Sequence, residues 1–376
     1  MAAVKHRLLL VLAVAVSIAL FPGCAPREAP PAEPAGAAAP APPAESAPQP
    51  EAAAPAPAAA GDPVAAMTEP PAMPKGYGSS AEVMVAIGNG DIALLDENPP
   101  VPEGVKEIAG LEYCNIDGTS LKLDLALPAE GEGPFPGLIF IHGGAWVSGE
   151  REIYHLYTYH FAQQGYAAAT ISYRLSGQAK FPAAVQDVKC AVRWMRANAA
   201  TYNIDPGNIA LIGGSAGGHL AMMVGYTPDV PEFEGEGGNP GVSSAVQAVV
   251  NFYGPYDLTA EIAQKSDDVQ GFLGATWDEN PDLHLKASPM HYLNAGDPPT
   301  LIFHGTIDEV VPVEQSERLA ARLGELGIPC VFERFEGWPH TMDLAQPVNE
   351  RCRWFMYRFF EAHLSPQPAA AAGAPQ

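Results

Sequence analysis

The stretch LIGGSAGGHL (residues 211–220) places one serine, Ser215, among four glycines. Three interpretations fit these residues alone: a flexible spacer, a phosphate-binding loop, or a tight turn that holds a nucleophile. Residues 213–217 have the form Gly-x-Ser-x-Gly, and they stand where an apolar run passes directly into a helical pattern. In that context the form is typical of a nucleophile elbow, because the sharp turn accepts only small residues beside the serine.

The other two interpretations need residues that the stretch does not have. A Walker-type phosphate loop requires Gly-Lys-Ser/Thr, and no lysine follows these glycines. A dinucleotide fingerprint requires Gly-x-Gly-x-x-Gly after the first strand of a βαβ unit. Ser215 is therefore the candidate nucleophile.

Apolar runs and helical patterns alternate on both sides of this turn. We expect a hairpin over 108–128 around Asp117-Gly118, and helices over 181–206, 216–226, 313–327 and 349–364. Residues 160–175 are expected to form a helix, a glycine stop and a buried strand. Further buried strand runs are expected in 137–144, 208–215, 245–255, 298–308 and 329–337. In the helix over 181–206, residues 185, 188, 192 and 195 form one apolar stripe, and Pro206 marks its end. This order predicts a single α/β domain, with a mostly parallel sheet and helices on both faces.

The motif HGGAW (residues 142–146) follows an earlier strand. Acyl transfer develops negative charge on the former carbonyl oxygen, and backbone N–H groups beside glycines can stabilise that charge. The expected oxyanion donors are the N–H groups of Gly143, Gly144, Ala145 and Ala216. We expect His142 to hold the loop. Trp146 is interpreted as a wall of the acyl pocket, with a plain core residue as the alternative.

A serine nucleophile needs a base and an acid that orients the base. Asp308 follows a strand in HGTIDEVVP, and His340 follows the last strand in EGWPHTMD. Parallel strands end at one edge of the sheet, so both can meet Ser215 there in the chain order Ser, Asp, His. The alternative acids weighed against Asp308 are Glu309, Asp257 and Asp343. His219 and His304 are interpreted as structural.

These motifs together resemble a known family. From about residue 106 to residue 364 the chain is similar to the α/β-hydrolase fold, and to its esterase/lipase group that includes hormone-sensitive-lipase-like carboxylesterases and BD-FAE domains. The matching stretches are HGGAW, SYRL, the run 181–206, GGSAGGHLA, ASPMHYL, HGTIDEVVP and GWPH. Two positions depart from the pattern: Ala145 replaces a third glycine, and Gly214 stands where many members have Asp or Ser.

The resemblance implies a serine hydrolase of carboxylic esters that needs no metal and no cofactor. The expected substrate is a short-chain or carbohydrate-linked ester. Two alternatives stay open: a serine peptidase of the prolyl-oligopeptidase kind on the same fold, and a catalytically silent surface-binding protein. The pocket loops expected near 147–160, 228–245 and 255–290 leave the acyl and alcohol specificity undefined.

The N-terminus has the pattern of a secretory signal peptide. A basic start precedes an apolar run over 8–21, and Gly23-Cys24 resembles a lipobox although Phe21 stands where Leu is usual. We expect a signal segment over 1–24 with lipidation at Cys24, a disordered Pro/Ala-rich linker over 25–75, the domain over 76–364 and a disordered tail over 365–376. Residues 76–105 are expected either to cover the mouth of the site or to stay loose. The protein is expected to be extracytoplasmic, secreted or lipid-anchored, and to meet a membrane only through that anchor.

Charge and cysteines set further limits. The formal net charge of −23 argues against nucleic-acid binding, which needs a basic surface. Besides Cys24, the cysteines have no zinc-site spacing. These four cysteines are Cys114, Cys190, Cys330 and Cys352. The sequence is compatible with any of their three possible disulfide pairings and also with four free thiols.

Overall fold

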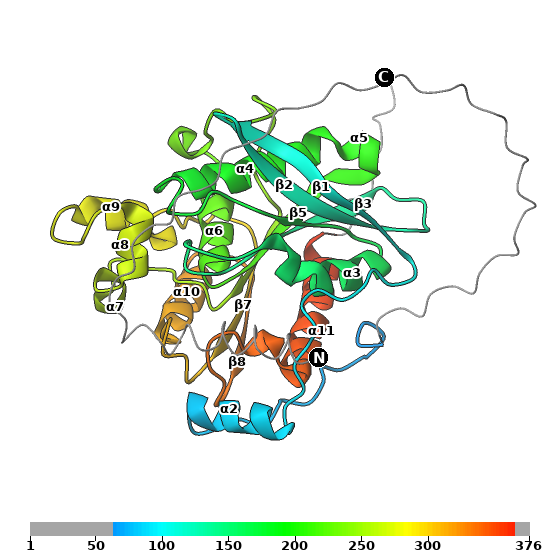
Figure 1. The fold of residues 1–376 in the computed structure, drawn as a ribbon, viewed down its shortest axis with the longest axis vertical. Helices are drawn as coiled ribbons and strands as arrows, with labels where there is room; N and C mark the ends of the chain where they lie inside the picture. The colour runs from blue at the N-terminus through cyan, green and yellow to red at the C-terminus, as the bar shows by residue number, and fades with distance from the viewer. Residues whose placement is uncertain (1–62, 365–376) are drawn as a thin grey trace, which may run out of the picture. The chain divides into compact units, whose positions relative to one another are not determined.

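The protein was analysed as a computed structural model that describes residues 63–364. The expected signal segment, Cys24 and the tail over 365–376 lie outside the described residues. In the described part, eight strands form one sheet in the order β1-β2-β4-β3-β5-β6-β7-β8 (Figure 1). The pairs β1–β2 and β2–β4 are antiparallel and all later pairs are parallel. The strands are β1 Val105–Ile116, β2 Thr119–Pro128, β3 Phe135–Ile141, β4 Ala167–Ile171, β5 Ile204–Gly214, β6 Ala248–Phe252, β7 Thr300–Gly305 and β8 Cys330–Phe335.

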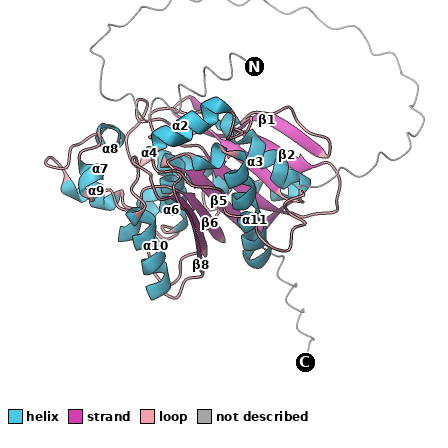
Figure 2. Cartoon of the chain, turned by 90° about the horizontal axis from the view of Figure 1, so that it is seen from below, coloured by secondary structure: helices cyan, strands magenta, loops and turns pink. Residues whose placement is uncertain are grey.

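Helices cover both faces of the sheet, as the sequence predicts (Figure 2). Buried side chains of α4, α6 and α10 share one core cluster, whereas those of α3, α11 and α2 share another. The helices are α2 Ser80–Asn89, α3 His155–Gln163, α4 Ala183–Ala197, α5 Ala199–Tyr202, α6 Ala216–Gly225, α7 Glu261–Gln264, α8 Asp267–Leu273, α9 Pro281–Lys286, α10 Glu314–Glu325 and α11 Gln346–His363. No helix within residues 63–364 is both long and apolar enough to cross a membrane.

Strand alternation divides the core into these two clusters. In β3, Leu138 and Phe140 join the cluster under α3 and α11, while Ile139 and Ile141 join the cluster under α4 and α6. Because successive side chains of a strand point to opposite faces, a strand that is apolar at every position is buried on both sides. The predicted stripe of α4 is fully buried, which confirms that prediction; its members are Val185, Val188, Val192 and Met195.

The helical stretch before β5 ends earlier than predicted. Asn203, not Pro206, terminates it, with φ +56°, after α4 and α5. Asparagine tolerates this left-handed conformation better than most residues. The strand then begins at Ile204, which pairs with Phe135, so Pro206 lies inside β5.

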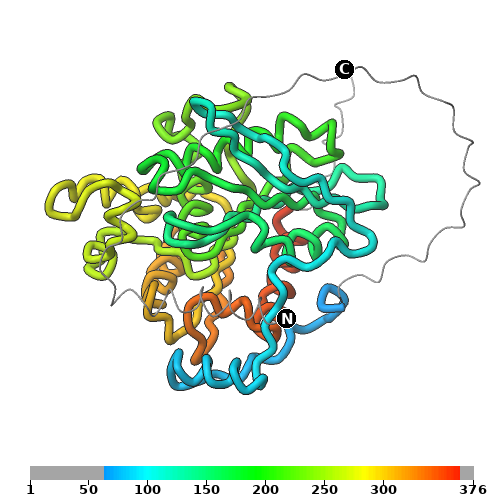
Figure 3. The backbone as a smooth tube through the Cα atoms, in the orientation of Figure 1, coloured from blue at the N-terminus to red at the C-terminus, as the bar shows by residue number. Residues whose placement is uncertain are grey.

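The domain begins before residue 76, so the predicted linker boundary is wrong. Arg358 donates to the carbonyls of Ala65 and Met67, and Trp354 Nε1 donates to the carbonyl of Met67 at 3.0 Å. Val64 is buried against the same core. The segment 63–75 therefore packs on α11, beside which it runs in the tube view (Figure 3).

Residues 76–105 are packed on the domain, not loose. Ser79 caps α2 through its side chain, and Gly90 closes the helix with φ +82°. Val83 and Ala86 of α2 are buried. Further along, Leu94 forms an antiparallel bridge with Ala345, just before α11. The segment thus covers the turn between β8 and α11.

The two edge strands are irregular or exposed. Strand β1 pairs with β2 through two register shifts, between Ile108 and Leu111 and between Glu112 and Cys114. Strand β8, at the other edge, is fully buried only at Phe335. The Asp117-Gly118 turn that joins β1 to β2 has positive φ at both residues, as a tight hairpin turn requires.

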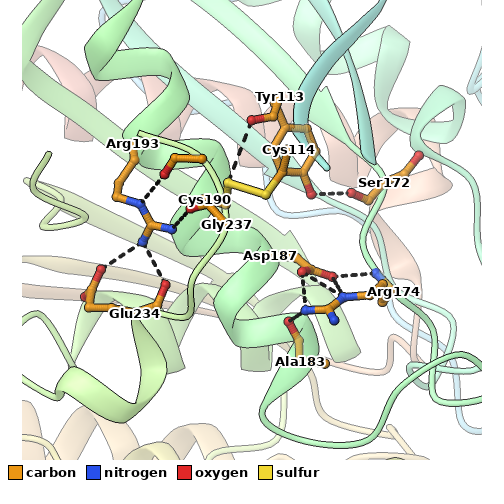
Figure 4. The surroundings of a disulfide bond; sticks show 11 residues. Tyr113, Cys114, Ser172, Arg174, Ala183, Asp187, Cys190, Arg193, Glu234 and Gly237 are labelled. Carbon is orange, nitrogen blue, oxygen red and sulfur yellow. Dashed lines mark hydrogen bonds and ion pairs between the residues drawn. A yellow bond between two sulfur atoms is a disulfide. The ribbon is translucent and has the colours of Figure 1, made fainter. Parts of the chain in front are cut away.

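The described residues contain one disulfide, which is neither a complete pairing of the four cysteines nor the alternative of four free thiols. Cys114 of β1 and Cys190 of α4 form a disulfide, while Cys330 and Cys352 are free (Figure 4). Beside it, the predicted pocket loop over 228–245, an insertion between α6 and β6, is bound to α4. Arg193 donates to the carbonyl of Gly237 at 2.6 Å and pairs with Glu234 at 2.9 Å. The disulfide and this ion pair together attach the hairpin and the insertion to α4.

Removing the disulfide is expected to destabilise the domain. The bond spans 76 residues of sequence, and the Cys114→Ala/Cys190→Ala variant should lose about 2–4 kcal/mol of unfolding free energy because its unfolded chain is less restricted. Urea unfolding measures the change. Cys352→Ala, which removes a buried free thiol, is the matched control for lost packing. Equal losses in the two variants would contradict the prediction.

Candidate active site

Ser215 lies at the junction of β5 and α6 with φ +55° and ψ −120°. A non-glycine residue in this region is strained and is characteristic of functional turns. The neighbouring positions must be glycine because a side chain there would clash with the backbone. A Cβ on Gly213 would lie 2.2 Å from the Gly217 carbonyl carbon, and a Cβ on Gly217 would lie 2.0 Å from the Ile141 carbonyl oxygen. The Ser215 N–H donates to the Phe252 carbonyl at 2.9 Å. The turn therefore has the geometry that the sequence predicts.

The structure brings Ser215, His340 and Asp308 together. His340 Nε2 is 2.9 Å from Ser215 Oγ, and its Nδ1 is 2.6 Å from Asp308 Oδ2. Asp308 follows β7 and His340 follows β8. Both therefore lie at the carboxyl ends of the parallel strands, where Ser215 lies after β5. The other Asp308 oxygen accepts from the backbone N–H groups of Val310 and Val311. The carboxylate is thus fixed on both sides.

His304 contacts Asp308, the candidate acid, and this contact could not be predicted from the sequence. Its Nε2 is 3.2 Å from Asp308 Oδ2 and 2.8 Å from the Val311 carbonyl, and its Nδ1 is 2.7 Å from Ser316 Oγ. Burial alone would raise the pKa of Asp308. The charge of His340 and the hydrogen bonds from both histidines outweigh it and hold that pKa well below its usual range. Asp308 therefore stays ionised and accepts hydrogen bonds.

The alternative acids lie in other surroundings. Asp257 caps the backbone of Thr259 and pairs with Arg318 at 2.7 Å, and Glu309 is exposed. Asp343 is buried and accepts hydrogen bonds from the hydroxyls of two tyrosines. None of the three has a hydrogen bond to His340 within the described chain.

The loop after β3 has an unusual run of positive φ values. They are +103° at Gly144, +52° at Ala145 and +59° at Trp146. A Cβ on Gly143 would lie 3.2 Å from the Ser215 Cβ, so the loop passes directly beside the serine. Within residues 63–364 the N–H groups of Gly143, Gly144 and Ala145 donate to no protein acceptor. Ala216 begins α6, where helix N–H groups are unpaired. These four donors are available to a ligand, and their role stays a prediction.

His142 is fully buried and supports this loop. Its Nδ1 lies 2.8 Å from the Gly143 carbonyl, and its ring stacks on Tyr173 at 4.4 Å between centroids. Burial lowers its pKa to about 4, so the ring is neutral at physiological pH. His219 is also buried, and its Nε2 lies 2.7 Å from the Ala287 carbonyl. Both positions agree with the structural roles expected for them.

Trp146 lies deeper than a pocket wall usually does. It is 4% exposed, stacks on Phe272 at 4.5 Å and meets His219 edge-on at 5.0 Å. It therefore belongs to the core cluster under α4 and α6. Its predicted contact with an acyl group stays a prediction.

Besides Asp308, Glu97 is a carboxyl group with a shifted pKa, and the charge of Asp343 acts on it. Burial, with repulsion from Asp343 and Asp96, raises its pKa from 4.5 to about 7. Between pH 4.5 and about 7, the carboxyl of Glu97 is therefore more protonated in the folded protein than in the unfolded chain. The free energy of unfolding falls as pH rises through this range. Glu97→Gln should be as stable as wild type near pH 4.5 and more stable by about 1–2 kcal/mol at pH 8.

Urea unfolding at both pH values tests this expectation. Glu103→Gln, at an exposed position, is the matched control and should change stability equally at the two pH values. A Glu97→Gln variant whose stability relative to wild type is independent of pH would contradict the assignment.

Comparisons with known proteins agree with this geometry. Residues 123–323, more than half of the chain, match the BD-FAE family. Esterase LipC of Mycobacterium tuberculosis is 38% identical over 218 residues, which cover 56% of this chain and 54% of that protein. The chain spans about half the length of the curated relatives it matches.

Two solved structures share the fold over most of the described domain. A truncated carbohydrate esterase from gut microbiota has a TM-score of 0.61 and 28% identity, covering 72% of this chain and 99% of that one. Thermogutta terrifontis esterase 2, phosphoramylated by tabun, has a TM-score of 0.61 and 29% identity, covering 73% and 100%. With the elbow, the sheet order and the matched residues, these findings identify an α/β-hydrolase that belongs to the BD-FAE family.

Proposed function

We propose that this chain hydrolyses carboxylic esters through a serine nucleophile and an acyl-enzyme. The observation that carries the proposal is the imidazole of His340, hydrogen-bonded to Ser215 Oγ and to Asp308 Oδ2. An ionised Asp308 can only accept, so the hydrogen resides on His340 Nδ1. Nε2 is then left with a lone pair that faces the serine hydroxyl, as a general base requires.

The proposed reaction has two halves. Ser215 Oγ attacks the ester carbonyl carbon while its proton passes to His340 Nε2. The bond to the alcohol oxygen breaks, and that oxygen takes the proton from His340. Water then attacks the acyl-enzyme while its proton passes to the same nitrogen. The bond between the acyl carbon and Ser215 Oγ breaks, and Oγ takes the proton from His340, which releases the acid and restores the serine. The developing oxyanion would accept from the N–H groups beside Ser215, those of Gly143, Gly144, Ala145 and Ala216.

The proposed substrate is a short-chain or carbohydrate-linked ester. The name of LipC supports an ester substrate, and the name of the gut carbohydrate esterase supports a carbohydrate-linked one. The test is hydrolysis of p-nitrophenyl acetate, butyrate and octanoate, and release of acetate from an acetylated oligosaccharide. An aminoacyl p-nitroanilide is the comparison for amide hydrolysis. Turnover of the anilide without any ester would refute the proposal in favour of a peptidase.

The proposed location is outside the cytoplasm, with a lipid anchor at Cys24. The basic start, the apolar run and the Gly23-Cys24 pair support it. Mass spectrometry of the mature N-terminus tests it: a diacylglyceryl-modified Cys24 is expected. An unmodified N-terminus at any other residue would contradict anchoring.

A further inference from the structure

Tyr253 lies between the nucleophile turn and the candidate base. It is the first residue after β6, is buried, and has φ +43°. Its N–H donates to the Phe303 carbonyl at 2.8 Å, which anchors this strained backbone to β7. A Cβ on Gly214 would lie 3.3 Å from the Tyr253 hydroxyl oxygen. The strained conformation therefore places the phenol against the elbow.

The Tyr253 ring also contacts His340. The two ring centroids are 4.5 Å apart, with 56° between the planes. This is direct contact with the ring that must hold hydrogen bonds to Ser215 and Asp308 at the same time. An imidazole held by two hydrogen bonds can still tilt about the line that joins them. A side chain packed on its face restricts that tilt.

The phenol itself is fixed from the other side. The Tyr253 hydroxyl donates to Asp343 Oδ1, and the Tyr157 hydroxyl donates to Asp343 Oδ2 at 3.1 Å. Asp343 is buried and lies three residues after His340. A buried carboxylate without donors is costly, so these hydrogen bonds are maintained and orient the phenol. Within the described residues, Tyr157 has no ring contact with His340; its ring neighbours are Phe140, Tyr154 and Phe252.

We propose that Tyr253 is a positioning residue for His340 and that Asp343 holds Tyr253 in place for this role. The inference rests on the proposed function, since it concerns the base of that reaction. It goes beyond the serine, histidine and aspartate by naming a second buried aspartate and a tyrosine that act through the imidazole. A mere core role would instead make Tyr253 and Tyr157 equivalent, because both donate to the same carboxylate.

The test compares Tyr253→Leu, Tyr253→Phe and Tyr157→Phe in the full chain. Two quantities are measured: kcat and KM on p-nitrophenyl acetate, and the rate of Ser215 labelling by a fluorophosphonate probe. Tyr253→Leu should lower kcat and the labelling rate about 100-fold with KM within about threefold, because misplacement of a catalytic group mainly affects the chemical step. Tyr253→Phe, which keeps the ring, should be about 10-fold more active than Tyr253→Leu and remain about 10-fold below wild type.

Tyr157→Phe is the matched control and should stay within about threefold of wild type, because the Tyr253 ring still rests on His340. Thermal melting checks each fold, and Tyr253→Phe carries the test if Tyr253→Leu does not fold. Equal losses in Tyr157→Phe and Tyr253→Phe, or wild-type labelling of Tyr253→Leu, would overturn the proposal. If the wild type is labelled but hydrolyses no ester, the proposed function fails, while the labelling ratios still decide the role of Tyr253. A wild type that is not labelled would overturn both.

Discussion

Ser215→Ala is expected to lower kcat on p-nitrophenyl acetate by about 10⁵- to 10⁶-fold. The variant keeps the turn and the N–H groups beside it, but it removes the atom that forms the acyl bond. His340 then has no hydroxyl from which to take a proton. Residual turnover would come from attack of water on the bound ester, with the N–H groups stabilising the oxyanion that forms.

Steady-state hydrolysis and fluorophosphonate labelling measure this effect. Ser243→Ala, at an exposed position, is the matched control and should retain wild-type activity. Both variants should melt near the wild-type temperature, so that lost activity reports lost chemistry. Wild-type hydrolysis by Ser215→Ala would show that another nucleophile carries the reaction.

Asp308→Asn is expected to lower kcat by about 10⁴-fold at neutral pH. The carboxylate accepts from His340 Nδ1 at 2.6 Å, which leaves Nε2 free to take the serine proton. An amide at this position can donate to Nδ1, which favours the opposite tautomer and places a hydrogen on Nε2. It also removes the charge that stabilises the imidazolium.

The control for this effect is Glu309→Gln, which neutralises the adjacent exposed carboxylate. It should change kcat by less than about twofold, because surface charges interact weakly. Measurements at several pH values, with a thermal melt for each variant, separate catalysis from stability. A large loss in Glu309→Gln with a small one in Asp308→Asn would reverse the assignment of the acid.

Much of this site could be predicted because its three candidate catalytic residues occur at equivalent positions, each shortly after a strand. Ser215, Asp308 and His340 each follow an apolar strand run, and parallel strands end at one edge of the sheet. The Gly-x-Ser-x-Gly spacing around Ser215 is visible in the sequence. The cause of this spacing is steric, because a Cβ on Gly213 or Gly217 would clash with the backbone. These are local patterns with a single structural solution.

The supporting residues could not be predicted in the same way. Tyr253 and His304 are aromatic residues at the ends of strands, a position where core packing is the ordinary expectation. Their roles depend on contacts with residues far away in the sequence, such as the one between Tyr253 and His340. The pairing of Cys114 with Cys190 and the packing of residues 63–75 on α11 likewise depend on tertiary geometry.

The irregular edges of the sheet have a consequence for self-association. An exposed, flat edge strand offers free N–H and C=O groups to the strand of another molecule. The two register shifts in β1 break that regular array. At the far edge, β8 carries the exposed Arg334, and a charged side chain opposes pairing between copies. Neither edge is a good template for a growing intermolecular sheet, so the folded protein should resist edge-to-edge aggregation even when many copies are crowded on one surface.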